Sequence, residues 1–156
     1  VHWAFDRYGT EDVPVLGPGF IKPFRDHHTD PQGICGHSFV ETNGNACIAC
    51  IPLLATGLLL DPGAHMFWVS LCFGTSIGVF MTNQFHSWAH DPDPPRVAVI
   101  LQRAGLILDP EHHQRHHSGE YDSNYCITNG WMNPLMERTR IFHRFEAIFP
   151  PTVQRH

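Results

Sequence analysis

Basic side chains are scarce in this chain of 156 residues. Ten Lys and Arg stand against fifteen Asp and Glu, so the formal net charge is −5 when the histidines are neutral. Proteins that bind nucleic acids normally present a basic stripe to the phosphates. The charge balance therefore argues against a nucleic-acid partner.

Cysteine is also scarce and follows no regular framework. The five cysteines are an odd number, and three of them, Cys47, Cys50 and Cys72, lie in apolar stretches. We expect these three to be packing residues of a protein in a reducing compartment. Cys47 and Cys50 also match a CxxC pattern, which leaves a zinc or redox site as the alternative, although the chain has no second CxxC.

Charged residues are missing from two long stretches. Ala46 to Leu60 is almost wholly apolar, and Ala64 to Phe85 contains no Asp, Glu, Lys or Arg. At about 1.5 Å per helical residue the second stretch spans roughly 30 Å, the thickness of the hydrocarbon core of a bilayer. We predict an all-α integral membrane domain with a helical hairpin over about 43–85 that turns at 61–63. A buried hairpin of a soluble protein is the alternative.

The hairpin also predicts where the polar residues meet. Two antiparallel spans return the chain to the side that it left, so the histidines before and after the hairpin share one membrane face. All ten Lys and Arg lie on that side. By the positive-inside rule the histidine face is cytosolic.

The remaining segments predict shorter elements. Val97 to Leu108 is amphipathic, and it could lie in the membrane interface or cap the domain as an ordinary helix. Asp109-Pro110-Glu111 is typical of a helix start, and a final amphipathic helix is predicted over 135–149. We therefore expect one domain over 1–149, followed by a C-terminal tail over 150–156.

Histidine is the residue type that the chain has in excess, with thirteen copies. Ten of them form clusters with the spacing of metal ligands: His2 with Asp6, His27 with His28, His37, His86 with His90, and His112, His113, His116 and His117. Imidazole is the commonest metal-binding side chain. Residues three or four apart share a helix face, so such clusters can each bind one ion or bridge two.

The donor set favours two iron ions over a single zinc ion. Structural zinc sites take four ligands and commonly include thiolates, whereas eight or more histidines occur here with one carboxylate and no clustered thiolate. A HExxH zinc-protease helix is absent from the sequence. A histidine-rich iron pair suits reactions with oxygen, including removal of hydrogen from an unactivated C–H bond.

Six motifs resemble those of the Kua/CarF family. They are His2-Trp-Ala-Phe-Asp6-Arg-Tyr-Gly9, Pro23-Phe-Arg-Asp-His27-His28, Phe39-Val-Glu-Thr-Asn-Gly44, Thr82-Asn-Gln-Phe-His86-Ser-Trp-Ala-His90, His112-His-Gln-Arg-His-His117 and Tyr125-Cys-Ile-Thr-Asn-Gly-Trp131. The resemblance extends from His2 to about Glu146. That family contains plasmanylethanolamine desaturases, which form the vinyl ether bond of plasmalogens.

The resemblance implies an oxygen-dependent, membrane-embedded di-iron desaturase. Its cofactors would be two iron ions, with O2 as cosubstrate and electrons from cytochrome b5 or a ferredoxin-like protein. Its substrate would be a 1-alkyl glycerophosphoethanolamine lipid, in the endoplasmic reticulum of a eukaryote or the inner membrane of a bacterium. A plant branch of the family, which acts on the palmitoyl chain of phosphatidylglycerol, makes an acyl-lipid desaturase or a hydroxylase the alternative. A membrane metal transporter or sensor is the alternative from another class, but it should carry His or Asp mid-membrane, and 66–85 contains neither.

The resemblance also implies the ligands. They are His2, Asp6, His27, His28, His86, His90, His113, His116 and His117, with His37 and His112 as a second tier that could orient ligands by hydrogen bonds. Glu41 and Asn43 could make similar contacts or meet the headgroup, with a helix cap as the alternative for Asn43. Since relatives carry membrane helices ahead of the His2 motif, we expect the chain to be an N-terminally truncated fragment.

Overall fold

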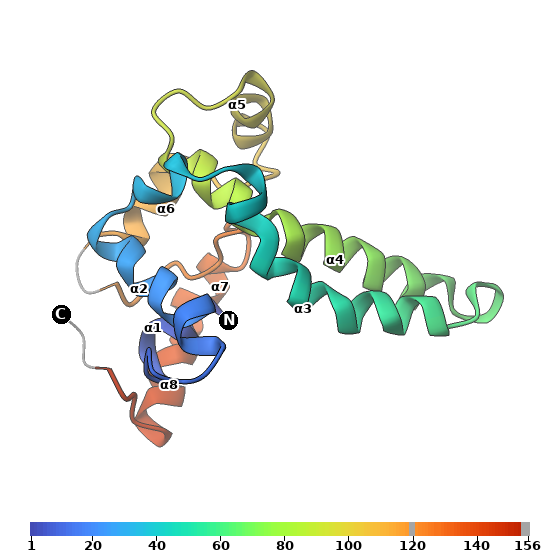
Figure 1. Ribbon diagram of the computed structural model, residues 1–156, viewed down its shortest axis with the longest axis horizontal. Coiled ribbons are helices and arrows are strands. Elements are labelled where there is room, and N and C mark those ends of the chain that lie inside the picture. Colours follow the sequence, from blue (N-terminus) through green and yellow to red (C-terminus); the bar gives the residue numbers. More distant parts are fainter. Residues whose placement is uncertain (119–120, 154–156) are drawn as a thin grey trace.

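A computed structural model describes residues 1–118 and 121–153, which contain helices and no strand. The helices are α1 (His2–Arg7), the π-helix η1 (Gly17–Ile21), α2 (Lys22–Thr29), the 3-10 helix η2 (Gly33–Gly36), α3 (Phe39–Leu59), α4 (Pro62–His90), α5 (Arg96–Arg103), α6 (Pro110–His116), α7 (Asn133–Thr139) and α8 (Ile141–Ile148). The predicted all-α class is confirmed. Helices α3 and α4 form a hairpin that projects from a lobe built by the described residues of 1–38 and 91–153 (Figure 1).

Local hydrogen bonds fix where the hairpin helices begin. Ser38 Oγ accepts from the backbone N–H of Glu41 at 3.4 Å, and Glu41 Oε2 accepts from the N–H of Ser38 at 2.8 Å, which is a capping box. Asp61 caps α4 by accepting from Gly63 N–H at 3.0 Å, with Pro62 as the first helical residue. The hairpin is therefore longer than the predicted 43–85, and Pro62 and Gly63, which were predicted to turn, are helical.

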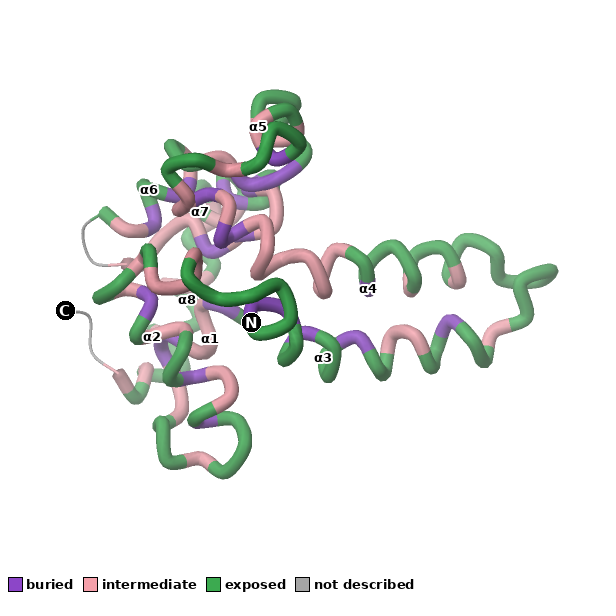
Figure 2. The backbone as a smooth tube through the Cα atoms, turned by 45° about the horizontal axis from the view of Figure 1, so that its top comes forward, coloured by how far each residue is buried: buried purple, intermediate pink, exposed green. Residues whose placement is uncertain are grey.

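Both hairpin helices are long and apolar enough to cross a bilayer. Helix α3 has 21 residues and α4 has 29, and only 28% and 6% of their most apolar windows are buried. Figure 2 shows the exposed outer part of α4. A soluble core helix would be covered by protein, so this exposure argues against the alternative of a buried soluble hairpin. Long, apolar and uncovered helices are those of an integral membrane domain.

Helices α1 and α8 contact each other in the lobe, although they lie far apart in the sequence. Glu146 in α8 accepts from Arg7 Nε at 2.9 Å and from Trp3 Nε1 at 2.9 Å, and the Arg7 and Glu146 side chains are almost fully buried. Thr152 N–H donates to the Arg7 carbonyl at 3.0 Å. Part of the predicted tail thus packs on α1, while its residues 154–156 lie outside the described residues.

Two predicted helices differ in the structure. The segment predicted as one helix over 135–149 is divided into α7 and α8, because Arg140 between them has the left-handed φ of 49°. The amphipathic stretch is helical only up to Arg103. Beyond it the chain turns at 104–105, where Gly105 has a φ of 66°, and the buried Leu108 donates its N–H to the Thr128 carbonyl at 3.0 Å.

Candidate metal centre

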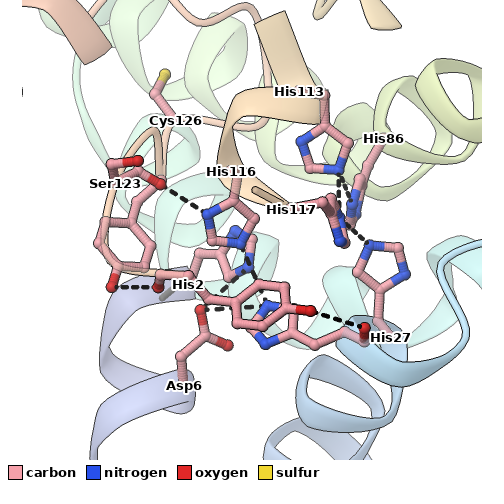
Figure 3. A network of polar contacts seen from close by, with 12 residues as sticks. His2, Asp6, His27, His86, His113, His116, His117, Ser123 and Cys126 are labelled. Atoms are coloured by element: carbon pink, nitrogen blue, oxygen red, sulfur yellow. Dashed lines mark hydrogen bonds and ion pairs between the residues drawn. The ribbon is translucent and has the colours of Figure 1, made fainter. Parts of the chain in front are cut away.

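The structure brings the nine predicted first-tier ligands together as two groups of donor atoms. The five-histidine group consists of His27, His86, His90, His113 and His117, and the Asp6 group consists of His2, Asp6, His28 and His116. Within each group the donor atoms lie within 4.8 Å of one another. The groups are drawn from α1, α2, the last turns of α4, and α6 (Figure 3).

Adjacent histidines divide between the groups because of helix geometry. Successive residues of an α-helix point about 100° apart, so His27 joins the five-histidine group and His28 the Asp6 group. His116 and His117, where α6 ends, divide in the same way. The ring centroids of these pairs are 6.3 Å and 5.3 Å apart, respectively. The two groups are therefore direct neighbours.

Ring nitrogens crowd the centre of the five-histidine group. His113 Nε2 lies 2.7 Å from His90 Nε2, 2.8 Å from His86 Nε2 and 3.1 Å from His117 Nε2. A ring nitrogen carries either one hydrogen or one lone pair, so His113 Nε2 cannot form good hydrogen bonds to all three. Converging lone pairs of this kind fit a bound cation.

Burial keeps the imidazoles neutral at physiological pH. Removal from water lowers the pKa of His27 to about 2 and that of His117 to about 3, with a further contribution from neighbouring histidines. Burial and the proximity of His116 lower the pKa of His28 to about 4. Since a neutral imidazole is the form that ligates metal, these rings are in the correct protonation state.

The Asp6 group contains a buried carboxylate that lacks a hydrogen bond from any described residue. Asp6 Oδ2 faces His2 Nε2 at 3.3 Å and His28 Nε2 at 3.7 Å. Burial raises the Asp6 pKa to about 8, although Arg25 and Arg7 act in the opposite direction. A carboxylate held in this way among neutral imidazoles also fits a cation.

One ligand candidate is oriented by a backbone group. His116 Nδ1 lies 2.7 Å from the Ser123 carbonyl oxygen, to which it can only donate (Figure 3). This bond fixes the tautomer and leaves the lone pair on Nε2, which faces the Asp6 group. His28 is held differently, by stacking on Tyr121 with ring centroids 4.5 Å apart and an interplanar angle of 8°.

The second-tier histidines lie outside both groups. His112 Nε2 accepts from Asn133 Nδ2 at 3.0 Å, and Asn133 Oδ1 accepts from Cys126 N–H at 2.8 Å, so these residues join α6 to the loop before α7. His37 is exposed and lines a cavity that also reaches His27. His112 therefore anchors the helix that carries the ligand candidates, and its role in orienting them by hydrogen bonds stays a prediction.

Several residues support the fold around the site through contacts that the sequence did not indicate. Asn43 is fully buried, and its Oδ1 accepts from the N–H of Gln84 at 3.1 Å, so it ties α3 to α4 rather than capping a helix. Glu41 caps α3 instead. Glu146 holds α1, which carries His2 and Asp6. Glu146 is visible in the sequence as a charged residue within an amphipathic stretch. Its partners in α1 are not, because they lie at the other end of the chain.

The CxxC pattern does not form a site among the described residues. Cys50 is buried, and its thiol donates to the Ser76 carbonyl at 3.3 Å, whereas Cys47 is exposed. Neither belongs to a group of potential ligands in the part of the chain that the structure describes. Cys50 is therefore a packing residue of the hairpin, in agreement with the sequence.

Comparisons with known proteins find desaturases. The chain is similar to the plasmanylethanolamine desaturase of Myxococcus xanthus, with 43% identity over 151 residues that make up 95% of this chain and 53% of that protein. It is similar to plasmanylethanolamine desaturase 1 of Mus musculus, with 36% identity over 156 residues, 95% of this chain and 58% of that protein. The chloroplastic fatty acid desaturase 4 of Arabidopsis thaliana is 33% identical over 152 residues, 95% of this chain and 46% of that protein.

The extent of these matches defines what is shared. This chain spans about half the length of the curated relatives that it matches. No solved structure matches it significantly. The lipid desaturase domain matches residues 1–154, which confirms the resemblance seen in the motifs: this chain belongs to the lipid desaturase domain family.

Proposed function

We propose that this chain forms the catalytic core of an oxygen-dependent di-iron desaturase that makes plasmalogens. It introduces the 1'-alkenyl double bond, a vinyl ether, into 1-alkyl glycerophosphoethanolamine lipids. The observation that carries the proposal is the pair of adjacent donor groups where the membrane hairpin enters the lobe. Family membership supports lipid desaturation, and two relatives are named plasmanylethanolamine desaturases.

The donor atoms favour iron over zinc. Each group offers more than the three protein ligands of a catalytic zinc site, and neither contains a thiolate. Bound iron would supply the activation of O2 that removal of hydrogen from an unactivated carbon requires. The reaction balances when the lipid loses two hydrogens, an external donor gives two electrons, two protons are taken up, and O2 becomes two water molecules.

The residues of this chain have three tasks in the reaction. All nine first-tier residues hold the ions, four on the Asp6 side and five on the other. The Ser123 carbonyl and the pair of Asn133 and His112 keep α6 and its rings in place. Phe24, whose ring lies 5.0 Å from that of His2, excludes water from one side.

The membrane arrangement belongs to the same proposal. The histidine face is cytosolic, where cytochrome b5 or a ferredoxin-like protein delivers electrons. The membrane is the endoplasmic reticulum in a eukaryote or the inner membrane in a bacterium. Acyl-lipid desaturation, as of the phosphatidylglycerol palmitoyl chain, is the second candidate because of the 33% identity to a fatty acid desaturase.

The full-length protein that contains this chain tests the proposal. Purified protein is analysed for metal and incubated, with an electron donor and O2, with labelled 1-alkyl and 1-acyl lipids. We expect about two iron ions per chain and acid-labile vinyl ether product from the alkyl lipid. A double bond in the acyl chain would establish the second candidate. Bound zinc without oxidation of either lipid would favour a transporter or sensor and overturn desaturation.

A further inference from the structure

Two cavities approach the donor groups from different directions. The larger, of about 400 Å³, reaches His27 and His86 of the five-histidine group. The smaller, of about 290 Å³, reaches His2 of the Asp6 group. Both cavities are bounded by Phe20, Phe24 and Asn83, which therefore form a common wall between them.

The smaller cavity is mainly apolar and lies where the membrane hairpin meets the lobe. Ala46 and Ala49 of α3 and Val79 of α4 line it, and Ile127 covers it on the lobe side. Among the described residues, no Asp, Glu, Lys or Arg side chain lines it, and His2 is the member of the two donor groups that does. An apolar cavity of this kind holds hydrocarbon in preference to water.

The larger cavity is more polar, although Phe20, Phe24 and Ile34 also line it. Asp26, Asp30 and Glu41 line it, and no Lys or Arg side chain of the described residues does. It is thus suited to the polar, hydrated end of a molecule. The two cavities adjoin along Phe20, Phe24 and Asn83, so a hydrocarbon chain in the smaller cavity lies beside the larger one.

Aromatic contacts make this wall rigid. The Phe5 ring lies 5.8 Å from that of Phe20 and 5.5 Å from that of Phe24, and Phe24 also contacts His2 edge to face. Aromatic pairs at these separations are favourable beyond their burial. The wall can therefore position a chain against the Asp6 group.

We propose that the smaller cavity binds the hydrocarbon chain of the substrate, so that the carbons to be oxidised lie beside His2 and the polar end lies toward the larger cavity. This inference rests on the proposed function. The small side chain of Ala49 leaves space for the hydrocarbon chain, because a larger side chain there would occupy the cavity. This placement of the lipid explains why oxidation is directed to carbons close to its polar end.

The first test maps the bound chain without turnover. A 1-alkyl glycerophosphoethanolamine that carries a photoreactive diazirine early in its alkyl chain is cross-linked to the full-length protein in lipid nanodiscs. We expect labelled peptides to contain residues 46–49, 79–83 or 125–128. Labelling confined to the outer faces of the hairpin, or to residues that line only the larger cavity, overturns the proposal.

The second test compares two neighbouring substitutions on α3. Ala49→Phe fills the cavity, whereas Ile48→Phe changes a residue that is 56% exposed and does not line it. We expect Ala49→Phe to lower cross-linking and vinyl ether formation at least about tenfold, because small displacements of reacting atoms are costly, and Ile48→Phe to change neither. Equal losses in both variants, or none in either, overturn the assignment of the cavity.

The two proposals fail in different ways. If the chain is labelled in the smaller cavity but no vinyl ether forms, the function is wrong while the hydrocarbon site stands. If vinyl ether forms but the label lies elsewhere and Ala49→Phe is fully active, the function stands and the hydrocarbon site is wrong.

Discussion

The hairpin and the lobe distribute their side chains in opposite ways. On the hairpin, large apolar side chains such as Phe67 and Ile77 are mostly exposed, and in the lobe His113 and His116 are 1% and 0% exposed. A soluble protein buries the first kind and exposes the second. Each part therefore depends on a different surrounding: lipid covers the hairpin, and we expect bound ions to engage the converging nitrogen lone pairs at the centre of the lobe.

The apolar core of the lobe is too small to explain its order. Its buried apolar cluster consists of Ala89, Leu108 and Ile127, with Phe24 packed against it. Buried ion pairs and hydrogen bonds, such as Arg7 with Glu146, supply much of the remaining contact. Because net gains from such bonds are small, we expect the lobe to depend strongly on its ions.

The largest effect is expected at the middle of the five-histidine group. His113→Ala removes the nitrogen that faces three others. Iron should be lost from this group, and vinyl ether formation should fall by at least about 100-fold, beyond the usual effect of changing a residue behind a ligand. Iron analysis and lipid mass spectrometry of the full-length variant measure both.

His65→Ala is the matched control for this substitution. His65 lies in α4 near the tip of the hairpin, away from both groups. We expect its iron content and rate to equal those of the wild type. A His113→Ala protein with full iron content and a normal rate would contradict the ligand assignment.

Removal of iron should destabilise the lobe but not the hairpin. A ligand present at about 1,000 times its dissociation constant stabilises the folded state by about 4 kcal/mol, which chelation would abolish. Hydrogen exchange in nanodiscs should then quicken in α6 and in the described loop before α7, while α3 and α4 keep their protection. Uniform protection with and without iron would mean that the lobe does not depend on ions.

A charged substitution on the hairpin tests whether lipid covers its exposed apolar side chains. Ile77 in α4 is 67% exposed. Ile77→Lys should oppose insertion by about 3 kcal/mol, as a lysine at the centre of a membrane helix does, whereas Ile77→Leu should be neutral. Resistance of each variant to alkaline extraction from membranes measures insertion. Equal retention of the two variants would indicate that this surface faces water or protein.

The sequence predicted the elements better than their partners. Charge-free stretches marked the hairpin, and histidine spacing together with the family motifs marked all nine residues that the structure brings together. Which group each histidine joins depends on how α2 and α6 face one another, which local spacing does not encode. The break at Arg140 was also missed, because a single left-handed residue interrupts an otherwise helical pattern.

The contacts behind the site were the least predictable. Asn133 reaches His112 and Ser123 reaches His116 only after the loop folds over α6. Glu146 reaches Arg7 from the other end of the chain. Such bonds join distant segments, so no periodicity in a single sequence reveals them.

The smallest effect that we predict has opposite signs in two states of the protein. Asp6→Asn replaces a buried carboxyl group, whose oxygens accept no hydrogen bond from a described residue, with a neutral amide. Iron-free protein near neutral pH should gain at least about 1 kcal/mol, because burial penalises the ionised carboxyl but not a neutral amide. Iron-loaded protein should instead be weakened, since the Asp6 group loses its anionic ligand while the five-histidine group keeps its ion.

The stability difference between Asp6→Asn and the wild type should also depend on pH. Because the folded pKa of Asp6 is raised from 3.8 to about 8, the wild type loses stability relative to the variant as pH rises through that interval. Thermal unfolding of chelated protein should therefore show a larger advantage of Asp6→Asn at pH 8 than at pH 5. With iron bound, metal analysis should find the loss confined to one ion. If Asp6→Asn changed stability in the same direction with and without iron, Asp6 would be a structural carboxylate. The assignment of the Asp6 group as a metal site would then be wrong.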